Sequence, residues 1–489
     1  MSEEVSSEVR APSKAVQLAL DFVEPGDESL LESRENLGKK LPEGISSKQL
    51  YKDIVHIAWP SFIEMVLTQL VSMVDMMMVG RLGVWAITAT GLTIQPKFLL
   101  MTLFMSMNVG ATALVARYKG EGNQEKANNV LRQALLMTFC LSVVGSVIGY
   151  IFAEPLVKFM GAEEGITLAN GVDYFRIQMI GFVFLALTST MTATLRGVGS
   201  TRIAMIYNLI SNLVNVCFNF LLIYGYLGFP RLEVVGASIA TVIGQCTAFV
   251  IALTVVLKGN HYMILRLKDG FKPDWATMKS IANIGIPAAV EQLVMRAGMI
   301  IYVKTVASLG TLAYAIHQTC MNIQAMSFMT GQAFAVSATS LVGQSLGKKR
   351  PDFAEAYSRR TRRIGMVFSI FLGLSFILFG KYIVALYNTD PDFIKQGAKI
   401  LMFVAFCQPF QSSQFILAGA LRGAGDTRSI AVISFITVLL VRPGLAIIAI
   451  RGLGFGLEGA WLALIADQLL RSLLVFLRYN SGKWKTIKV

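Results

Sequence analysis

The feature that most constrains this chain is an apolar run at residues 54–80, IVHIAWPSFIEMVLTQLVSMVDMMMVG. As a helix it is about long enough to cross the ~30 Å hydrocarbon layer of a bilayer. It nevertheless contains two carboxylates, and an ionised carboxylate deep in a membrane costs about 2.5 kcal/mol or more. Four polar side chains share one helical face: Glu64, Thr68, Ser72 and Asp75. The run therefore predicts a membrane-spanning helix whose polar face lines a protein interior or a watery cavity.

The rest of the chain repeats this character. Of its 489 residues, 54% are hydrophobic and only 15% are charged, and the mean hydropathy is +0.59. Eleven further apolar segments follow, at 88–118, 128–153, 168–195, 202–224, 236–257, 281–308, 312–346, 363–386, 396–421, 428–450 and 457–479. We therefore predict an all-α integral membrane protein with twelve transmembrane helices.

Basic residues alternate between the connections. One set of loops, with the C-terminal tail, holds 24 Lys and Arg, and the opposite set holds 7. Because cytoplasmic loops are enriched in Lys and Arg, we predict a multi-pass cell-membrane protein with both termini in the cytoplasm. This topology explains the net charge of +14, so no nucleic-acid partner is expected.

The two halves of the chain are repeats. Shifted by 227 positions, Pro60 matches Pro287, and LRGVGSTR at 195–202 matches LRGAGDTR at 421–428 with a shift of 226. GASIATVIGQ at 236–245 matches GAWLALIADQ at 459–468 with a shift of 223. Two six-helix bundles of equal orientation, related by an axis along the membrane normal, are typical of transporters with a site between the halves.

The predicted organisation has five parts. Residues 1–45 form an acidic, polar cytoplasmic tail, 46–257 the first bundle and 258–279 a polar cytoplasmic connector. Residues 280–480 form the second bundle and 481–489 a cytoplasmic tail. A phosphate-binding GxxxxGK[ST] loop and the common hydrolase motifs are absent from the sequence. We expect neither an enzyme nor a cofactor.

One polar cluster can be placed by its depth. Asp75 lies five residues before the end of its helix, Asn219 five before Tyr224, and Thr241 five after Gly236. At 1.5 Å per residue all three lie about 7–8 Å inside the same boundary. Asn215 is one turn deeper, in a stripe with Asn208 and Asn212. Carboxylate, amide and hydroxyl oxygens suit a monovalent cation or a proton relay; for Asn208 and Asn212, hydrogen bonding between helices is the favoured interpretation.

The repeat serves as an internal control. The positions equivalent to Asp75, Asn215, Asn219 and Thr241 are Tyr302, Val441, Leu445 and Leu464. Because the second bundle lacks these polar groups, the cluster is not needed for the bundle architecture itself. We therefore assign the predicted ion site to the first half.

Other intramembrane charges allow more than one interpretation. Glu64 and Glu291 are equivalent in the repeat, and either a shared structural role or attraction of a cationic substrate would explain them. An internal ion pair is favoured among Arg296, Arg442 and Asp467. His317 is interpreted as a packed, hydrogen-bonded residue rather than a proton carrier.

The two halves, the run VDMMMVGRLG at 74–83 and the paired LRGVGSTR and LRGAGDTR loops resemble the multidrug and toxic compound extrusion (MATE) family of secondary transporters. The resemblance covers about residues 50–480. It implies a V-shaped pair of bundles that exports amphipathic, often cationic compounds in exchange for protons or sodium ions. Asp75, Asn215, Asn219 and Thr241 match the family's amino-terminal cation site. Some members carry a second acid where this chain has Asn219, so one formal charge remains here and the resemblance does not decide between protons and sodium ions.

We therefore predict a secondary antiporter of small amphipathic, cationic molecules that works as a monomer among membrane lipids. Two rivals stay open. A lipid-linked saccharide flippase of related architecture would need a strongly cationic cavity, whereas the intramembrane charges here are mixed. An integral-membrane lipid enzyme would need a catalytic constellation near one membrane face, and none is evident in the sequence.

Overall fold

The computed structural model describes residues 45–162, 164–259, 261–266 and 270–487. The chain divides into two compact units, 1–46 and 47–489, and all described residues except 45 and 46 belong to the second. Apart from residue 45, the predicted polar tail lies outside the described residues. Within the described ranges the secondary structure is helical, with no strand. The predicted all-α class is confirmed.

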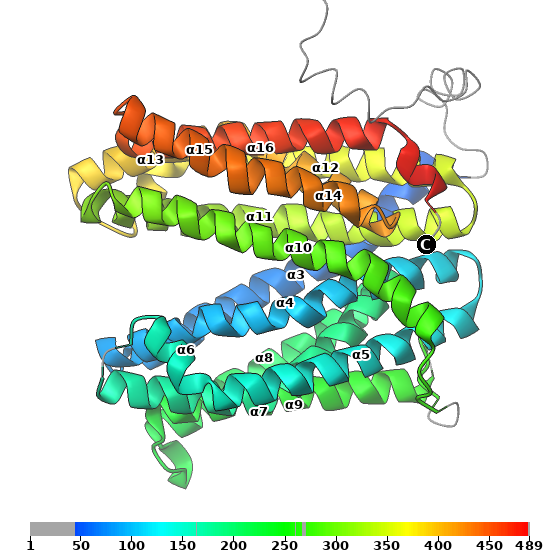
Figure 1. The fold of residues 1–489 in the computed structure, drawn as a ribbon, viewed down its shortest axis with the longest axis horizontal. Helices are drawn as coiled ribbons and strands as arrows, with labels where there is room; N and C mark the ends of the chain where they lie inside the picture. The colour runs from blue at the N-terminus through cyan, green and yellow to red at the C-terminus, as the bar shows by residue number, and fades with distance from the viewer. Residues whose placement is uncertain (1–44, 163, 260, 267–269, 488–489) are drawn as a thin grey trace, which may run out of the picture. The chain divides into compact units, whose positions relative to one another are not determined.

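Twelve long helices in the described part form two bundles (Figure 1). The first bundle contains α3 (Ser47–Gly80), α4 (Val84–Gly120), α5 (Gln124–Ile151), α7 (Ile166–Gly197), α8 (Thr201–Tyr224) and α9 (Glu233–Lys258), with the short α6 (Ala153–Phe159) and η1 (Tyr226–Gly228) between them. The second contains α10 (Trp275–Ala307), α11 (Thr311–Gly347), α12 (Pro351–Ala385), α13 (Pro391–Gly423), a segmented helix, and α16 (Gly456–Asn480), followed by η5 (Lys483–Thr486). The predicted pair of six-helix bundles is confirmed.

The segmented helix spans Thr427–Gly452. It consists of α14 (Thr427–Ser434), the π-helical η3 (Phe435–Val441), α15 (Arg442–Ile447) and the π-helical η4 (Ile448–Gly452). Pro443 has no N–H to donate back along the helix, and π-helical turns flank the segment that contains it. Arg442, the first residue of α15, is only 5% exposed and lies in the bundle interior.

Several helices extend beyond the apolar runs of the sequence. α12 begins at Pro351 rather than near 363, so most of the basic sequence between the predicted apolar segments 312–346 and 363–386 is helical. Glu355 and Arg359 form an ion pair one turn apart in this extension. Eleven of the helices in the described part are long and apolar enough to span a membrane, whereas α11 has too many polar residues to meet that criterion. Hydropathy locates the membrane-embedded part of a helix, not its ends.

The connector at 258–279 packs against α5 where it is described. Met263 and Leu265 are buried, and Ile264 N–H donates to Asn128. Asp274 caps α10 by accepting from the N–H groups of Ala276 and Thr277. Hydrogen bonds from the Thr277 hydroxyl and the Asn129 amide hold the pKa of Asp274 below its usual value. These contacts join the first bundle to the start of the second.

The bundles are joined by a close crossing of α4 and α11 at the end of the protein that carries the basic connections. A Cβ atom on Gly120 would overlap the carbonyl oxygen of Gln344, and one on Gly347 would overlap that of Arg117. Gly120 and Gly347 are equivalent in the repeat, as are Arg117 and Gln344. Only glycine lets the two backbones approach this closely. The crossing therefore lies on the approximate two-fold axis of the repeat.

We expect Gly120→Ala to lower the free energy of unfolding by about 1–3 kcal/mol, because the backbones must move apart to admit a methyl group. Gly91→Ala, in the same helix, is the matched control, since a Cβ there meets open space. Melting of the purified variants, followed by intrinsic fluorescence in detergent, measures both effects. Equal melting temperatures for the two variants would contradict the account of the crossing.

Candidate functional site

A ladder of side-chain hydrogen bonds joins α3 to α8 within the first bundle. Its three steps run from Asn208 to Glu64 at 2.5 Å, from Asn212 to Thr68 at 3.1 Å and from Asn219 to Asp75 at 2.6 Å. The asparagine stripe of α8 thus faces the polar face of α3. Asn208 and Asn212 each join the two helices, as the favoured interpretation of these residues predicted.

The four residues of the predicted ion site lie together at one end of this ladder. With its amide nitrogen toward α3, Asn215 donates to both carboxylate oxygens of Asp75 at 3.2 and 3.0 Å and accepts from the backbone N–H of Thr241 at 3.2 Å. Asn219 is only 1% exposed, and its Oδ1 atom is buried without a hydrogen-bond partner among the described residues. A buried acceptor of this kind is costly to leave unsatisfied.

This arrangement supplies oxygen atoms and one formal negative charge. The described residues provide no Lys or Arg within ion-pair distance of Asp75. A carboxylate held by amides and beside a hydroxyl can take up a proton or contribute to a shell of oxygens around a hard monovalent cation. The Oδ1 atom of Asn219, which has no hydrogen-bond partner among the described residues, could be a further oxygen ligand of such a cation.

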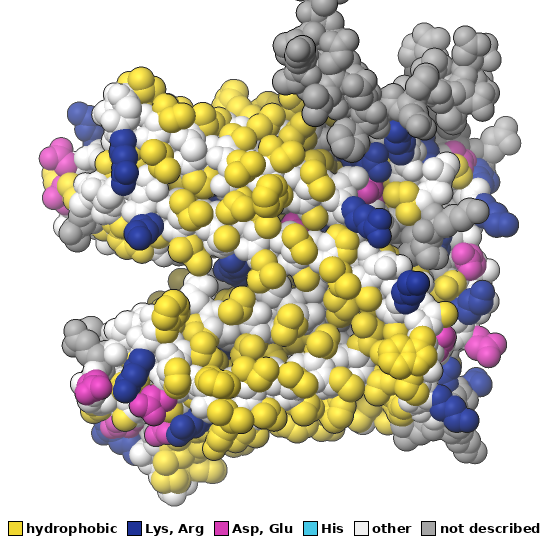
Figure 2. Space-filling view, viewed as in Figure 1, with side chains coloured by type: hydrophobic (Ala, Val, Ile, Leu, Met, Phe, Trp, Pro, Cys, Tyr) yellow, Lys and Arg dark blue, Asp and Glu magenta, His cyan; other side chains and the backbone are white. Residues whose placement is uncertain are grey.

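The cluster faces a cavity of about 970 Å³ between the bundles. Figure 2 shows the cleft, which is open toward the end of the protein near α6, at the left of the view. The walls come mainly from the first bundle, with Val336, Thr339 and Arg422 contributed by the second. Apolar side chains such as Phe98 and Met105 alternate with polar ones. Its volume is suited to a drug-sized molecule.

Two equivalent ion pairs lie at the base of the bundles. Arg196 contacts Glu64 at 2.8 Å, and Arg422 contacts Glu291 at 2.7 Å. The arginines come from the LRGVGSTR and LRGAGDTR segments, so the pairs are related by the repeat. Sequence reasoning identified both acids and both segments but did not connect them. Paired in this way, Glu64 and Glu291 neutralise the two arginines.

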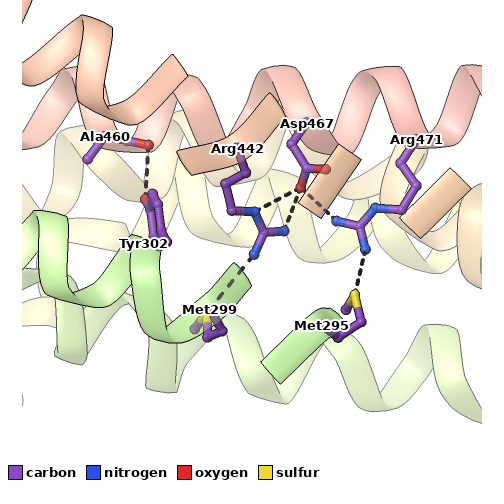
Figure 3. Close-up of polar contacts among 7 residues, drawn as sticks. All are labelled: Met295, Met299, Tyr302, Arg442, Ala460, Asp467 and Arg471. Carbon is purple, nitrogen blue, oxygen red and sulfur yellow. Dashed lines mark hydrogen bonds and ion pairs between the residues drawn. The ribbon is translucent and has the colours of Figure 1, made fainter. Parts of the chain in front are cut away.

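The second bundle contains a separate buried network, drawn in Figure 3. Arg442 donates to Asp467 at 2.9 and 2.5 Å, and Arg471 donates to the same carboxylate oxygen at 2.7 Å. Asp467 is fully buried. The expected pairing of Arg442 with Asp467 is therefore present, and Arg471 is a partner that sequence reasoning missed, although it lies one helical turn after Asp467.

Arg296 does not belong to this network, contrary to the sequence-based grouping. Its side chain is exposed, and its guanidinium lies 4.8 Å from the ring centroid of Phe98 in the first bundle. Such a cation–π contact is favourable.

The network fills the part of the second bundle that corresponds to the cavity wall of the first. Gly244 and Ala248 line the cavity, and the equivalent positions hold Asp467 and Arg471. Tyr302, the equivalent of Asp75, donates its hydroxyl to the carbonyl oxygen of Ala460 at 2.9 Å. The sequence difference between the two halves is therefore also a structural difference. Large side chains in the second bundle occupy the positions that line the cavity in the first.

His317 lies in the apolar part of the same bundle. It is fully buried between the rings of Tyr302 and Trp461, with centroids 5.6 and 5.4 Å from its own. Neither ring nitrogen has a hydrogen-bond partner among the described residues. The packing agrees with the expectation for this residue, but the expected hydrogen bond is not observed.

Lys97 is a cavity residue that sequence reasoning overlooked. It lies within α4 beside Pro96, and its ammonium donates to Gln178 of α7 at 2.6 Å. The available signal was a single Lys inside the apolar segment 88–118.

Two parallel helical bundles that enclose a polar cavity between them define a membrane transporter of the two-lobed class. The MatE family model matches residues 60–221 and 287–448, one copy in each half. The chain belongs to the MATE family, and its members are transporters rather than enzymes. Both matched segments are displaced by the same 227 positions found in the sequence, which confirms the repeat.

Curated relatives agree with this assignment. The chain is 26% identical over 438 residues to the probable multidrug resistance protein NorM of Thermotoga maritima, covering 89% of this chain and 94% of the relative. It is 26% identical to the multidrug resistance protein MdtK of Yersinia pestis, covering 87% and 94%. These relatives support a role in drug-extrusion transport.

The fold also matches solved structures. A MATE protein in a bent conformation aligns with a TM-score of 0.82 at 22% identity, covering 90% of this chain and 97% of that one. A multidrug resistance MATE transporter described as outward-facing aligns with a TM-score of 0.82 at 22% identity, covering 92% and 100%. At this identity the match establishes the fold alone.

We expect Asp467→Ala to destabilise the protein by about 3–5 kcal/mol, because it leaves two buried guanidiniums without their anion. Glu458→Ala is the control. Glu458 pairs with Lys399 at 2.7 Å but is 46% exposed, so its loss should cost less than about 1 kcal/mol. Melting of both variants in detergent measures the difference, and similar losses would contradict a stabilising role for the buried network.

Proposed function

We propose that this protein is a secondary antiporter that exports amphipathic, cationic small molecules in exchange for protons or sodium ions. The observation that carries the proposal is Asp75, a carboxylate without an ion-pair partner among the described residues that faces the large cavity between the bundles. A coupling ion and the cationic group of a substrate would both be attracted to this carboxylate. Their competition would couple the two fluxes.

The proposed direction of transport, export, rests on the similarity to multidrug resistance proteins, and the cleft shows how the coupling ion would reach its site. With the basic connections assigned to the cytoplasm, the open end of the cleft in Figure 2 faces the outside. An ion that enters from this side reaches Asp75, displaces substrate and favours a rearranged first bundle. Release of the ion to the inside resets the protein. A ligand can shift such an equilibrium only by its different affinities for the two states.

The cavity also supports action as a monomer, because both bundles that line it belong to one chain. The charges that line the cavity do not favour the alternative of a lipid-linked saccharide flippase. Of the three cations that line the cavity, Arg196 and Arg422 are paired with Glu64 and Glu291. A pyrophosphate group would therefore meet one cation without an acidic partner instead of the strongly cationic cavity that it requires.

We expect Asp75→Asn to abolish ion-driven export while the protein still folds, because the substitution keeps the shape of the side chain and removes its charge. The measurement is efflux of a lipophilic cationic dye from cells and from proteoliposomes, under separately imposed proton and sodium gradients. Cells that express the wild type should accumulate less dye than cells with the variant. Wild-type flux in Asp75→Asn, or greater dye accumulation in cells with the wild type, would refute the proposal.

We expect the two bundles to differ in ion coupling. Asn215→Ala and Asn219→Ala should weaken ion coupling and shift the ion concentration that gives half-maximal flux, because each removes an amide that serves as a sodium ligand or as a hydrogen-bond partner of Asp75. Val441→Ala and Leu445→Ala, at the equivalent positions, should leave that concentration unchanged and show only packing losses. All four values are measured in proteoliposomes. Equal shifts in the second-bundle variants would rule out a single coupling site in the first bundle.

A further inference from the structure

The charges around the cavity do not all neutralise one another. Five charged side chains line it: Glu64, Asp75, Lys97, Arg196 and Arg422. Arg196 is paired with Glu64, and Arg422 with Glu291 behind the wall. The described residues place no carboxylate within ion-pair distance of Lys97, and no Lys or Arg within that distance of Asp75. The cavity thus presents one acid and one base, each without a partner of opposite charge.

Lys97 is held in place by a neutral group. Its ammonium donates to Oε1 of Gln178, which is only 1% exposed. This amide fixes the position of the ammonium but does not balance its charge. Lys97 lies twelve residues after Trp85, the first residue of the spanning part of α4, or about 18 Å along the helix. At that depth an ammonium without an acidic partner is expensive, and such residues mark substrate pathways.

The acid and the base face the same space from neighbouring walls. Asp75 is on α3 and Lys97 is on α4. A third helix, α7, also contributes residues to the cavity wall. Tyr174 of α7 lines the cavity together with Asp75, and Gln178, one turn further along α7, holds Lys97. Apolar side chains, among them Phe98 and Met101, line the same cavity. A single amphipathic molecule can therefore reach both charges while its apolar body contacts these side chains.

We propose that Lys97 is a specificity-determining residue that binds the anionic group of a zwitterionic amphipathic substrate, whose cationic group lies toward Asp75. This inference rests on the proposed export function and narrows its substrate class from cations to zwitterions. The coupling ion at Asp75 competes with the cationic end only. Lys97 keeps its contact with the anionic end until the cavity changes shape.

The test compares two dyes that differ in one charge. Rhodamine B has a cationic ring system and a free carboxylate, and its ethyl ester keeps the cation but lacks the anion. Their dissociation constants are measured by fluorescence anisotropy with the purified full-length protein in detergent. Wild type should bind rhodamine B about tenfold more tightly than the ester, as expected for one partly buried, charge-assisted hydrogen bond.

The variants assign this preference to one side chain. Lys97→Met should remove it by weakening rhodamine B binding about tenfold, with little change for the ester, and Lys97→Arg should restore much of it. Lys158→Met, which removes an exposed lysine paired with Glu154 outside the cavity, should behave as wild type. Equal affinities of wild type for the two dyes, equal losses for both dyes in Lys97→Met, or absence of binding would overturn the inference.

Two further experiments distinguish a wrong substrate class from a wrong transport function. Competition with phosphatidylethanolamine, compared with phosphatidylglycerol, shows whether the zwitterion can be a membrane lipid. Displacement by phosphatidylethanolamine that depends on Lys97 supports a lipid source, and its absence supports a soluble molecule. Flux of both dyes under ion gradients tests export independently. Transport without a Lys97-dependent preference refutes the zwitterion, whereas Lys97-dependent binding without ion-driven flux refutes the antiporter.

Discussion

The close crossing of α4 and α11 determines where this protein can open. Because Gly120 and Gly347 let the two backbones meet, the bundles are held together at the end that carries the basic connections. Further contacts across the bundles lie nearby: the Ser340 hydroxyl donates to the carbonyl oxygen of Gly197 at 2.9 Å, and the Tyr357 hydroxyl donates to Asp53 at 2.6 Å. The cavity opens at the opposite end. A transporter that exposes this cavity to each side in turn must break these contacts, together with the apolar packing of Ile281 and Ile284 of α10 against the core of the first bundle.

Three carboxylates within the membrane-spanning helices are paired with arginines. Glu64, Glu291 and Asp467 each contact an arginine, and an ion pair of this kind costs more to break than it adds to stability. Each carboxylate neutralises an arginine that lies within the membrane-spanning helices. Asp75 and Lys97 depart from this pattern, since their hydrogen-bond partners are neutral amides. A charge without a partner of opposite sign in the protein can bind a ligand of opposite charge. Because such charges are costly within a membrane, Asp75 and Lys97 are candidates for ligand binding.

The sequence predicted the fold well because its strongest signals are periodic. Twelve apolar segments and a repeat displaced by 227 positions specify two equal bundles, and the depth of Asp75, Asn219 and Thr241 placed them together before their contacts were known. The missed features depend on distances between helices that no periodicity encodes. The unpredicted pairs of Arg196 with Glu64 and of Arg422 with Glu291 each join two helices, and the choice of Gln178 as the partner of Lys97 depends on how α7 crosses α4. Arg471, by contrast, lies one turn after Asp467 on α16, so helical periodicity could have identified it. The start of α12 was misjudged because the helix continues into charged sequence that hydropathy excludes.

The difference between the bundles has a simple physical origin. Small side chains at Gly244 and Ala248 leave space in the first bundle, and an ion or water can enter it from the cavity. At the equivalent positions Asp467 and Arg471 are large, and with Arg442 they supply both the anion and the cations that balance it. A guanidinium attached to the chain cannot exchange with solution, so the charge state of this network does not follow the ion concentration on either side of the membrane. In the first bundle the described residues place no Lys or Arg within ion-pair distance of Asp75. Two bundles built from one repeat therefore differ in charge balance: the second buries a carboxylate with two arginines, and the first exposes a carboxylate to the cavity.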